Sequence, residues 1–137
     1  MSVYQLEFSQ RHSYAEEQAG ITVPVLLRAG SVIVRLTAAV DTGASFCLFR
    51  REVAMALGLD VEQGLLRKFR TANSSFDAYE HEIDLSVLGV TTHSAVYFFA
   101  DESINKNVLG RGGWLDRVRL GIVEHDAQIY LSPYDDE

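Results

Sequence analysis

The chain has 137 residues, of which 47% are hydrophobic and 23% charged, and its net charge is −7. This composition predicts one globular domain spanning residues 1–137, and the acidic balance argues against nucleic acid as a partner, because phosphate binding needs a basic surface. A single cysteine, no apolar run near the roughly 20 residues of a membrane span, and no signal peptide together predict a cytoplasmic protein that does not contact membranes.

The first twenty residues are expected to hold a strand and a loop. Apolar and polar residues alternate over 3–8, which predicts the strand, and the polar stretch 9–20 predicts the loop. A second strand is predicted from Ile21, and its Pro24 places it at a sheet edge or a bulge because proline cannot donate to the ladder. The alternating run Val32–Val40 predicts a third strand, which ends at Asp41.

The centre of the chain predicts one helix and three strands. Apolar residues recur at helical spacing in 51–57, and Gly58 is a suitable C-terminal stop. Strands are predicted at 65–71 and 79–88, joined by a loop at 72–76. A further strand at 91–99 is apolar on both faces near its end and is therefore expected to be buried.

The last third predicts a polar loop, a short helix and a closing hairpin. The loop is 101–107, and an amphipathic helix is expected from Trp114 to near Gly121. Residues 122–124 and 128–131 are expected to pair, and 132–137 form an acidic tail. Many short strands with few helices predict a closed or partly closed β-barrel.

The end of the third predicted strand carries the most informative motif, Val-Asp-Thr-Gly-Ala-Ser at 40–45. A carboxylate at the end of a buried strand is costly unless it is hydrogen-bonded or useful, and a glycine lets backbone amides approach it. Asp, Thr and Gly also favour turns, so the triplet alone fits a simple strand-ending turn. Leu-Gly-Leu follows at 57–59, and Asn-Val-Leu-Gly-Arg follows at 107–111.

In this order, the motifs resemble those of the retropepsin-like aspartic proteases, in which two identical chains each contribute one Asp to a shared site. The resemblance runs from about Val23 to Leu131. It implies a mostly β fold, the closed acid-protease barrel with one or two short helices. It also implies an aspartic endopeptidase that hydrolyses peptide bonds without a cofactor or a metal.

The resemblance assigns roles to individual residues. Asp41 is implied to be catalytic, in a homodimer that pairs it with Asp41 of a second chain, because the other acids lack the flanking pattern. A flap at 72–76 is implied to close over a peptide or protein substrate. Supporting roles fall to Thr42, Gly43, Ala44, Ser45, Gly110 and Arg111, and substrate contacts to Asn73, Ser74, Ser75, Phe76 and Tyr79.

Two departures from the family pattern keep a second hypothesis open. The predicted flap tip has no glycine, and Ser45 stands where retroviral members often have an acid that pairs with the arginine of the Gly-Arg motif. A dimeric binding or scaffold domain that does not cleave is therefore the alternative. Other sites are less well supported: the histidines lack metal-ligand spacing, Ser45 lacks a nearby histidine for a serine triad, and 110–113 lacks the lysine of a P-loop.

Overall fold

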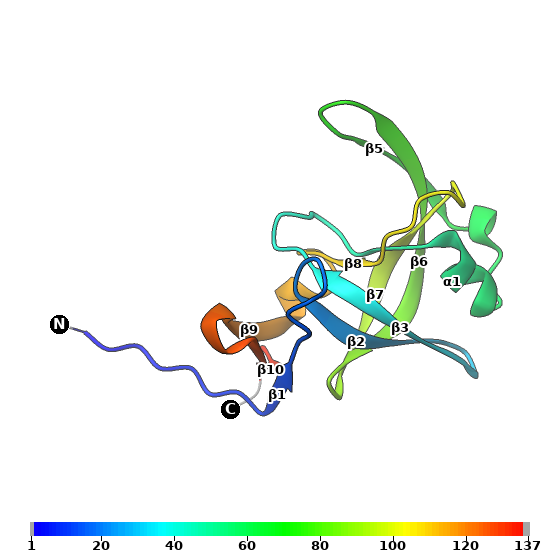
Figure 1. Ribbon diagram of the computed structural model, residues 1–137. Coiled ribbons are helices and arrows are strands. Elements are labelled where there is room, and N and C mark those ends of the chain that lie inside the picture. The colour runs from blue at the N-terminus through cyan, green and yellow to red at the C-terminus, as the bar shows by residue number, and fades with distance from the viewer. Residues whose placement is uncertain (1, 136–137) are drawn as a thin grey trace.

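β-Strands form most of the regular structure in the computed structural model, which describes residues 2–135 (Figure 1). The strands are β1 (Gln10–Ser13), β2 (Thr22–Ala29), β3 (Val32–Val40), β4 (Leu48–Phe49), β5 (Leu65–Arg70), β6 (Ser75–Val87), β7 (Val90–Phe99), β8 (Val108–Leu109), β9 (Val118–Val123) and β10 (Gln128–Pro133). The helices are α1 (Arg51–Ala56) and the 3₁₀ turns η1 (Val61–Gln63), η2 (Leu115–Arg117) and η3 (Glu124–Asp126). The predicted mostly β fold is confirmed. No helix in the described part of the chain is long and apolar enough to cross a membrane.

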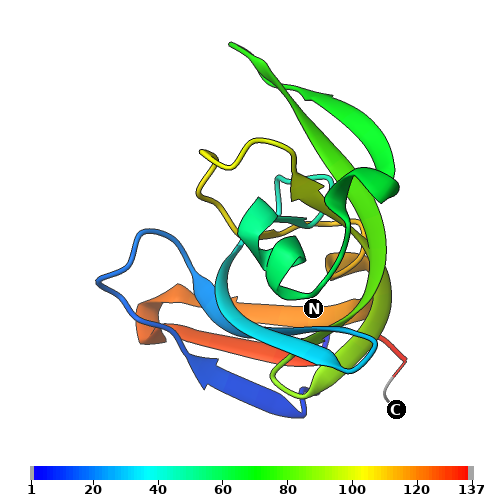
Figure 2. The same ribbon diagram turned by 90° about the vertical axis from the view of Figure 1, so that its right-hand side faces the viewer.

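The larger sheet curls into a ring of strands. Its order is β2-β3-β8-β4-β7-β6-β5, and β2 also pairs with β6, which joins the two sides of the sheet. β5 pairs with β6 beyond this junction, so the β5–β6 hairpin projects from the body of the molecule in both views (Figures 1 and 2). The smaller sheet, β1-β10-β9, lies beside the ring.

The core consists of apolar side chains on the inward faces of these strands. Burial of such side chains is the main favourable term in folding, at about 25 cal/mol per Å² of apolar area. Alternation along β6 gives one inward face, as the sequence predicts, and α1 adds Ala54. The largest fully buried side chains include Leu27, Phe49, Ile83, Leu85, Phe98, Leu109, Trp114, Ile129 and Leu131.

The third predicted strand is confirmed at its predicted bounds, and the expectation for Pro24 also holds. β2 pairs with β3 along its whole length, but its pairing with β6 begins only at Val25. Pro24 therefore lies where β2 is an edge on the β6 side, a position that tolerates a residue without an N–H.

The predicted N-terminal strand at 3–8 is wrong. Residues 2–8 have no regular structure, and Val3, Tyr4 and Leu6 are 80%, 91% and 64% exposed. The first strand is instead β1, inside the predicted loop 9–20, where it pairs with β10. An alternating pattern specifies a strand only when a ladder partner is available, and residues 3–8 have none in the described chain.

The C-terminal third differs from prediction in its boundaries. The helix expected from Trp114 to Gly121 is only the short turn η2, and Gly121 lies inside β9 opposite Tyr130. The closing hairpin is confirmed, but both of its strands are longer than predicted. β10 continues to Pro133, so the predicted tail 132–137 begins later than expected, and its residues 136–137 lie outside the described residues.

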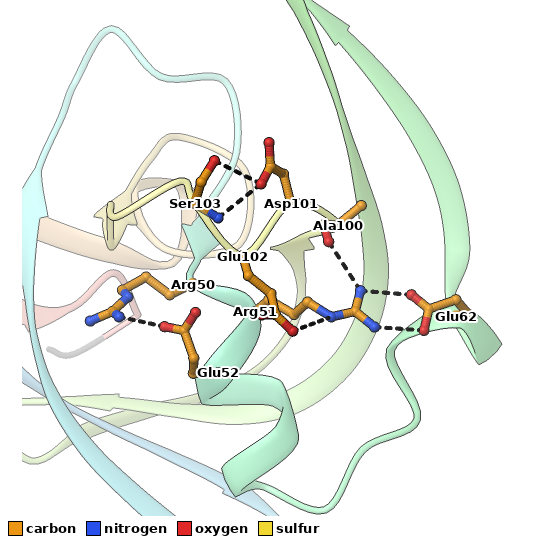
Figure 3. Close-up of polar contacts among 8 residues, drawn as sticks. All are labelled: Arg50, Arg51, Glu52, Glu62, Ala100, Asp101, Glu102 and Ser103. Atoms are coloured by element: carbon orange, nitrogen blue, oxygen red, sulfur yellow. Dashed lines mark hydrogen bonds and ion pairs between the residues drawn. The ribbon is translucent and has the colours of Figure 1, made fainter.

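Arg51 joins three segments at the base of the β5–β6 hairpin (Figure 3). Its guanidinium donates to both carboxylate oxygens of Glu62 at 2.7 Å and to the Ala100 carbonyl at 3.2 Å. Glu62 precedes β5, and Ala100 follows β7. The hydrogen bonds from Arg51 lower the pKa of the Glu62 carboxyl, so the pair is strongest when Glu62 is ionised.

We predict that Arg51→Met lowers the melting temperature at neutral pH. Because the pKa of Glu62 is lowered in the folded state, its contribution is present above its unfolded pKa and is lost as pH falls through its folded pKa. The difference between the wild type and Arg51→Met should therefore shrink below about pH 4. Arg35→Met, at an exposed β3 position, is the control. A difference that is constant from pH 7 to pH 3 would contradict this account.

Candidate active site

Asp41 lies immediately after β3, at an exposed turn on the ring. Alternation along β3 carries the chain to this point, and two backbone hydrogen bonds fix the strand end: Val40 N donates to Ile21 O at 2.8 Å and Asp41 N to Leu109 O at 2.9 Å. The backbone at Asp41 is therefore held on both sides by neighbouring segments, while its side chain faces outward.

The turn after Asp41 orients its carboxylate. The Gly43 amide donates to Asp41 Oδ1 at 3.0 Å, and the Ala44 amide donates to the Asp41 carbonyl at 3.1 Å. An Asx turn of this kind is a common use of Asp at the start of a loop. It leaves Oδ2 free of hydrogen bonds within residues 2–135. The carboxylate is thus fixed through Oδ1, and Oδ2 remains available to a ligand or a partner chain.

The second sequence motif lies directly against the first. β8 pairs in parallel with the end of β3, and beyond it Arg111 N donates to Ala44 O at 2.9 Å and Gly112 N to Ser45 O at 2.8 Å. Gly110 is required at the crossing, because a Cβ there would lie 2.8 Å from Ala44 O and closer still to the Phe46 carbonyl. The structure therefore brings together the motifs at 40–45 and 107–111.

Three of the six implied supporting residues line one surface beside the Asp41 turn. Thr42, Ser45 and Arg111 border a hollow of about 540 Å³ together with Gly112, Leu115 and Asp116. Thr42, Ser45 and Arg111 are exposed, and within the described chain their side chains form no hydrogen bond or ion pair. This surface therefore offers two hydroxyls and a guanidinium to a partner or ligand.

The predicted flap is a β-hairpin, but its tip lies earlier than expected. The loop is 71–74, closed by Thr71 N to Ser74 O at 2.8 Å and Ser74 N to Thr71 Oγ1 at 3.0 Å. Asn73 and Ser74 are exposed at the tip. Ser75 and Phe76 belong to β6 rather than to the loop, which corrects the predicted tip at 72–76.

Phe76 and Tyr79 do not share a face of the hairpin. Strand residues an odd number apart point to opposite sides. Phe76 stacks on Phe69 at 5.2 Å between ring centroids, whereas Tyr79 packs against the main core. Phe76 and Tyr79, both implied to contact substrate, therefore lie on opposite faces of the hairpin, and Phe76 is the one directed away from the core.

The Phe76 side of the hairpin carries a row of aromatic residues that the sequence analysis did not identify. Phe69 lies 5.9 Å from Phe46 and 5.2 Å from Tyr97, and Phe46 lies 5.1 Å from Tyr97. We call Phe46, Phe69, Phe76, Tyr97 and Phe99 the aromatic face. The sequence could have indicated part of this face. Phe69 and Phe76 lie opposite each other in the hairpin, on the same side as the pair Arg67 and Ala78, and this follows from alternation along the two strands. The contact with Phe46 could not be predicted without the fold.

Other reactive groups near the site do not compete with Asp41. Burial raises the pKa of the Cys47 thiol to about 11, so this fully buried side chain is protonated at neutral pH and is not a nucleophile. Within residues 2–135, no three His, Cys, Asp or Glu side chains gather as a metal site requires. The group presented at the turn is a carboxylate.

Comparisons with known proteins identify the family and the fold. A family model described as aspartyl protease matches residues 23–112, a span that includes both motifs. The chain belongs to the aspartyl protease family. Among curated proteins, none matches the sequence.

The fold of this aspartyl protease family member is similar to that of a protein from Rickettsia conorii. The crystal structure of a retropepsin-like aspartic protease from that organism superposes with a TM-score of 0.64, covering 90% of this chain and 97% of the other. At 19% sequence identity the likeness shows the fold, which is retropepsin-like as predicted.

We predict that Gly110→Ala disturbs the Asp41 turn and destabilises the fold. The added Cβ overlaps backbone atoms of Phe46 and Ala44, which cannot move without breaking the contacts between the two motifs, and such overpacking typically costs about 1–3 kcal/mol. Chemical denaturation measures the loss. Gly30→Ala is the comparison, because nothing lies within 4 Å of its added Cβ and only the strain of φ +58° applies. Equal losses in the two variants would contradict the close-approach argument.

Proposed function

We propose that two copies of this chain form an aspartic endopeptidase with Asp41 of each copy as the catalytic pair. The observation that carries the proposal is the Asp41 turn. Its carboxylate is oriented by the Gly43 amide, is exposed, and lies on the surface where Thr42, Ser45 and Arg111 have no partner in the described chain. Membership of the aspartyl protease family supports the same reaction class.

The chemistry follows from two carboxylates a few ångströms apart, which cannot both be ionised and therefore share one proton. The ionised member removes a proton from water as the water oxygen attacks the peptide carbonyl. The protonated member gives its proton to the carbonyl oxygen, which forms a tetrahedral diol. Collapse of the diol breaks the C–N bond, and the amine leaves with a proton returned through the pair.

A homodimer is the simplest source of the second carboxylate. The Asp-Thr-Gly motif occurs once in the chain, and a twofold axis beside Asp41 brings an identical turn opposite it. The hydroxyl of Thr42 and the guanidinium of Arg111 then find acceptors across the axis. The β5–β6 hairpin, which projects on the side of the loop 41–47 (Figure 1), covers the peptide.

A dimeric binding domain without catalysis is the second candidate. The observation that favours it is the hairpin tip, which has no glycine and is closed by the hydrogen bonds between Thr71 and Ser74. A tip braced in this way opens less readily than a glycine-rich one. Incubation with unfolded casein over acidic to neutral pH, with and without a statine-type inhibitor, separates the two candidates.

We predict that Asp41→Asn abolishes casein cleavage without loss of fold. The amide keeps the shape of the carboxylate and can still accept from Gly43, but the shared proton is gone. Melting temperature should hold or rise, because charge repulsion in the pair is removed. Asp60→Asn, at an exposed position with no side-chain cap hydrogen bond, is the matched control and should cleave normally. Full activity in purified Asp41→Asn would show that Asp41 is not the catalytic residue.

We predict that Thr42→Ala weakens the dimer. Losing a buried hydrogen bond costs about 1–3 kcal/mol, and twofold symmetry removes two at once, so the dissociation constant should rise at least about tenfold. Activity should fall most at low protein concentration and partly recover at high concentration. Sedimentation measures the equilibrium, with Thr37→Ala on β3 as the control. A wild-type monomer that still cleaves at micromolar concentration would overturn the shared site.

A further inference from the structure

Arg67 has an unusual position on the β5–β6 hairpin. It lies on β5, and its guanidinium carbon sits 4.5 Å from the centre of the Phe46 ring, 5.5 Å from that of Phe69 and 6.0 Å from that of Tyr97. These distances are within the range of cation–π attraction. Arg67 therefore lies over the aromatic face rather than in open solvent, although the residue as a whole is exposed.

A relay of hydrogen bonds fixes the guanidinium in this place. Arg67 Nη1 donates to the Tyr97 hydroxyl at 3.4 Å, and that hydroxyl donates to Glu80 Oε1 at 3.1 Å. Glu80 therefore interacts with Arg67 only indirectly, through the Tyr97 hydroxyl. Stacking and the relay hold the head group in one orientation, so little rotamer freedom is left to lose when a ligand binds.

Arg67 has no carboxylate of its own within 4 Å in the described part of the chain. Two neighbouring cations do have one: Arg51 pairs with Glu62 at 2.7 Å, and Lys68, the next residue on β5, pairs with Asp77 at 3.0 Å. A guanidinium carries five N–H donors, and one of them is used by Tyr97. The remaining donors are available.

The position of Phe46 ties Arg67 to the candidate active site. Phe46 belongs to the loop that begins at Asp41, and its backbone bridges to Gly112, next to Arg111. The residue directly beneath the guanidinium is therefore part of the loop that holds the catalytic carboxylate. A peptide lying between the hairpin and this loop passes the guanidinium.

We propose that Arg67 is a specificity-determining residue that selects substrates with a carboxylate side chain, Asp or Glu, beside the cleavage site. The proposal rests on the proposed endopeptidase function and deepens it by naming a substrate class. A carboxylate accepts two parallel hydrogen bonds from a guanidinium, whereas an amide side chain of the same shape brings no charge and only one acceptor oxygen. The net charge of −7 disfavours acidic peptides in general, so the selection depends on this local cation.

The first experiment maps cleavage sites in unfolded casein by mass spectrometry for the wild type, Arg67→Gln and Arg70→Gln. Arg70 lies on β5 three residues from Arg67 and therefore points to the opposite side of the strand, so it matches the charge change without touching the aromatic face. We expect one position near the scissile bond to be enriched in Asp and Glu for the wild type and Arg70→Gln. The enrichment should be absent for Arg67→Gln.

The second experiment uses two peptides built on the best casein site, one with Glu at the enriched position and one with Gln. The wild type should cleave the Glu peptide with a kcat/KM about tenfold or more above that of the Gln peptide, as one charge-assisted contact allows. Arg67→Gln should bring the ratio to about one, and Arg67→Lys should keep part of it. The preference should also fade below about pH 4, where the substrate carboxyl protonates.

The outcomes separate the two proposals. Absence of cleavage by every variant, including the wild type, overturns the proposed function and the substrate class together. Cleavage without acidic enrichment, or enrichment that survives in Arg67→Gln, overturns only the role of Arg67. If Arg67→Gln lowers kcat/KM equally for both peptides and leaves their ratio unchanged, Arg67 only anchors the hairpin. That result also overturns the role of Arg67 in substrate selection.

Discussion

The hydrogen bonds between the turn at 41–45 and the segment 109–112 are the constraint on which the rest of the structure depends. They pair Asp41 N with Leu109 O, Arg111 N with Ala44 O, and Gly112 N with Ser45 O. Through them β8 is placed between β3 and β4, where it pairs with both, and without it the ring of strands would have a gap. The same contacts close the fold and position the carboxylate, so stability and site geometry cannot vary independently.

Besides the β6–β7 ladder, which begins at Ala78, side-chain contacts attach the β5–β6 hairpin to this rigid ring at two different places. At its base, Arg51 holds the chain before β5 and after β7, and on the aromatic face Phe69 packs against Phe46. Within residues 2–135, the hydrogen bonds of the tip between these strands join Thr71 only to Ser74. Motion of the hairpin therefore requires parting the aromatic face, which buries apolar area, rather than flexing a glycine-rich tip. Phe46 belongs to both the Asp41 loop and the aromatic face, which couples the hairpin to the site.

Sequence reasoning succeeded where the local pattern and the pairing partner agreed. β3 ends at Asp41 as predicted because both of its pairing partners, β2 and β8, are present. The two motifs lie side by side because each one follows the end of a strand in the same ring. It failed where tertiary context decided. Residues 3–8 alternate but have no partner, and β6 begins at Ser75 rather than at the predicted residue 79, which places Phe76 in the strand and on the face opposite Tyr79. The aromatic face joins residues as distant as Phe46 and Phe99, which no window of sequence contains.

The division between what one chain supplies and what it lacks explains the form of the candidate site. One chain supplies orientation: the Gly43 amide holds one carboxylate oxygen, and the interlocked motifs hold the backbone. It leaves the other oxygen, the Thr42 hydroxyl and the Arg111 guanidinium exposed on one surface and without partners in residues 2–135. A lone exposed carboxylate has no second carboxyl group with which to share a proton. A second copy placed against this surface changes the reactivity of the carboxylate without changing its geometry. In the proposed enzyme, the fold of one chain therefore fixes the position of Asp41, and formation of the dimer determines its reactivity.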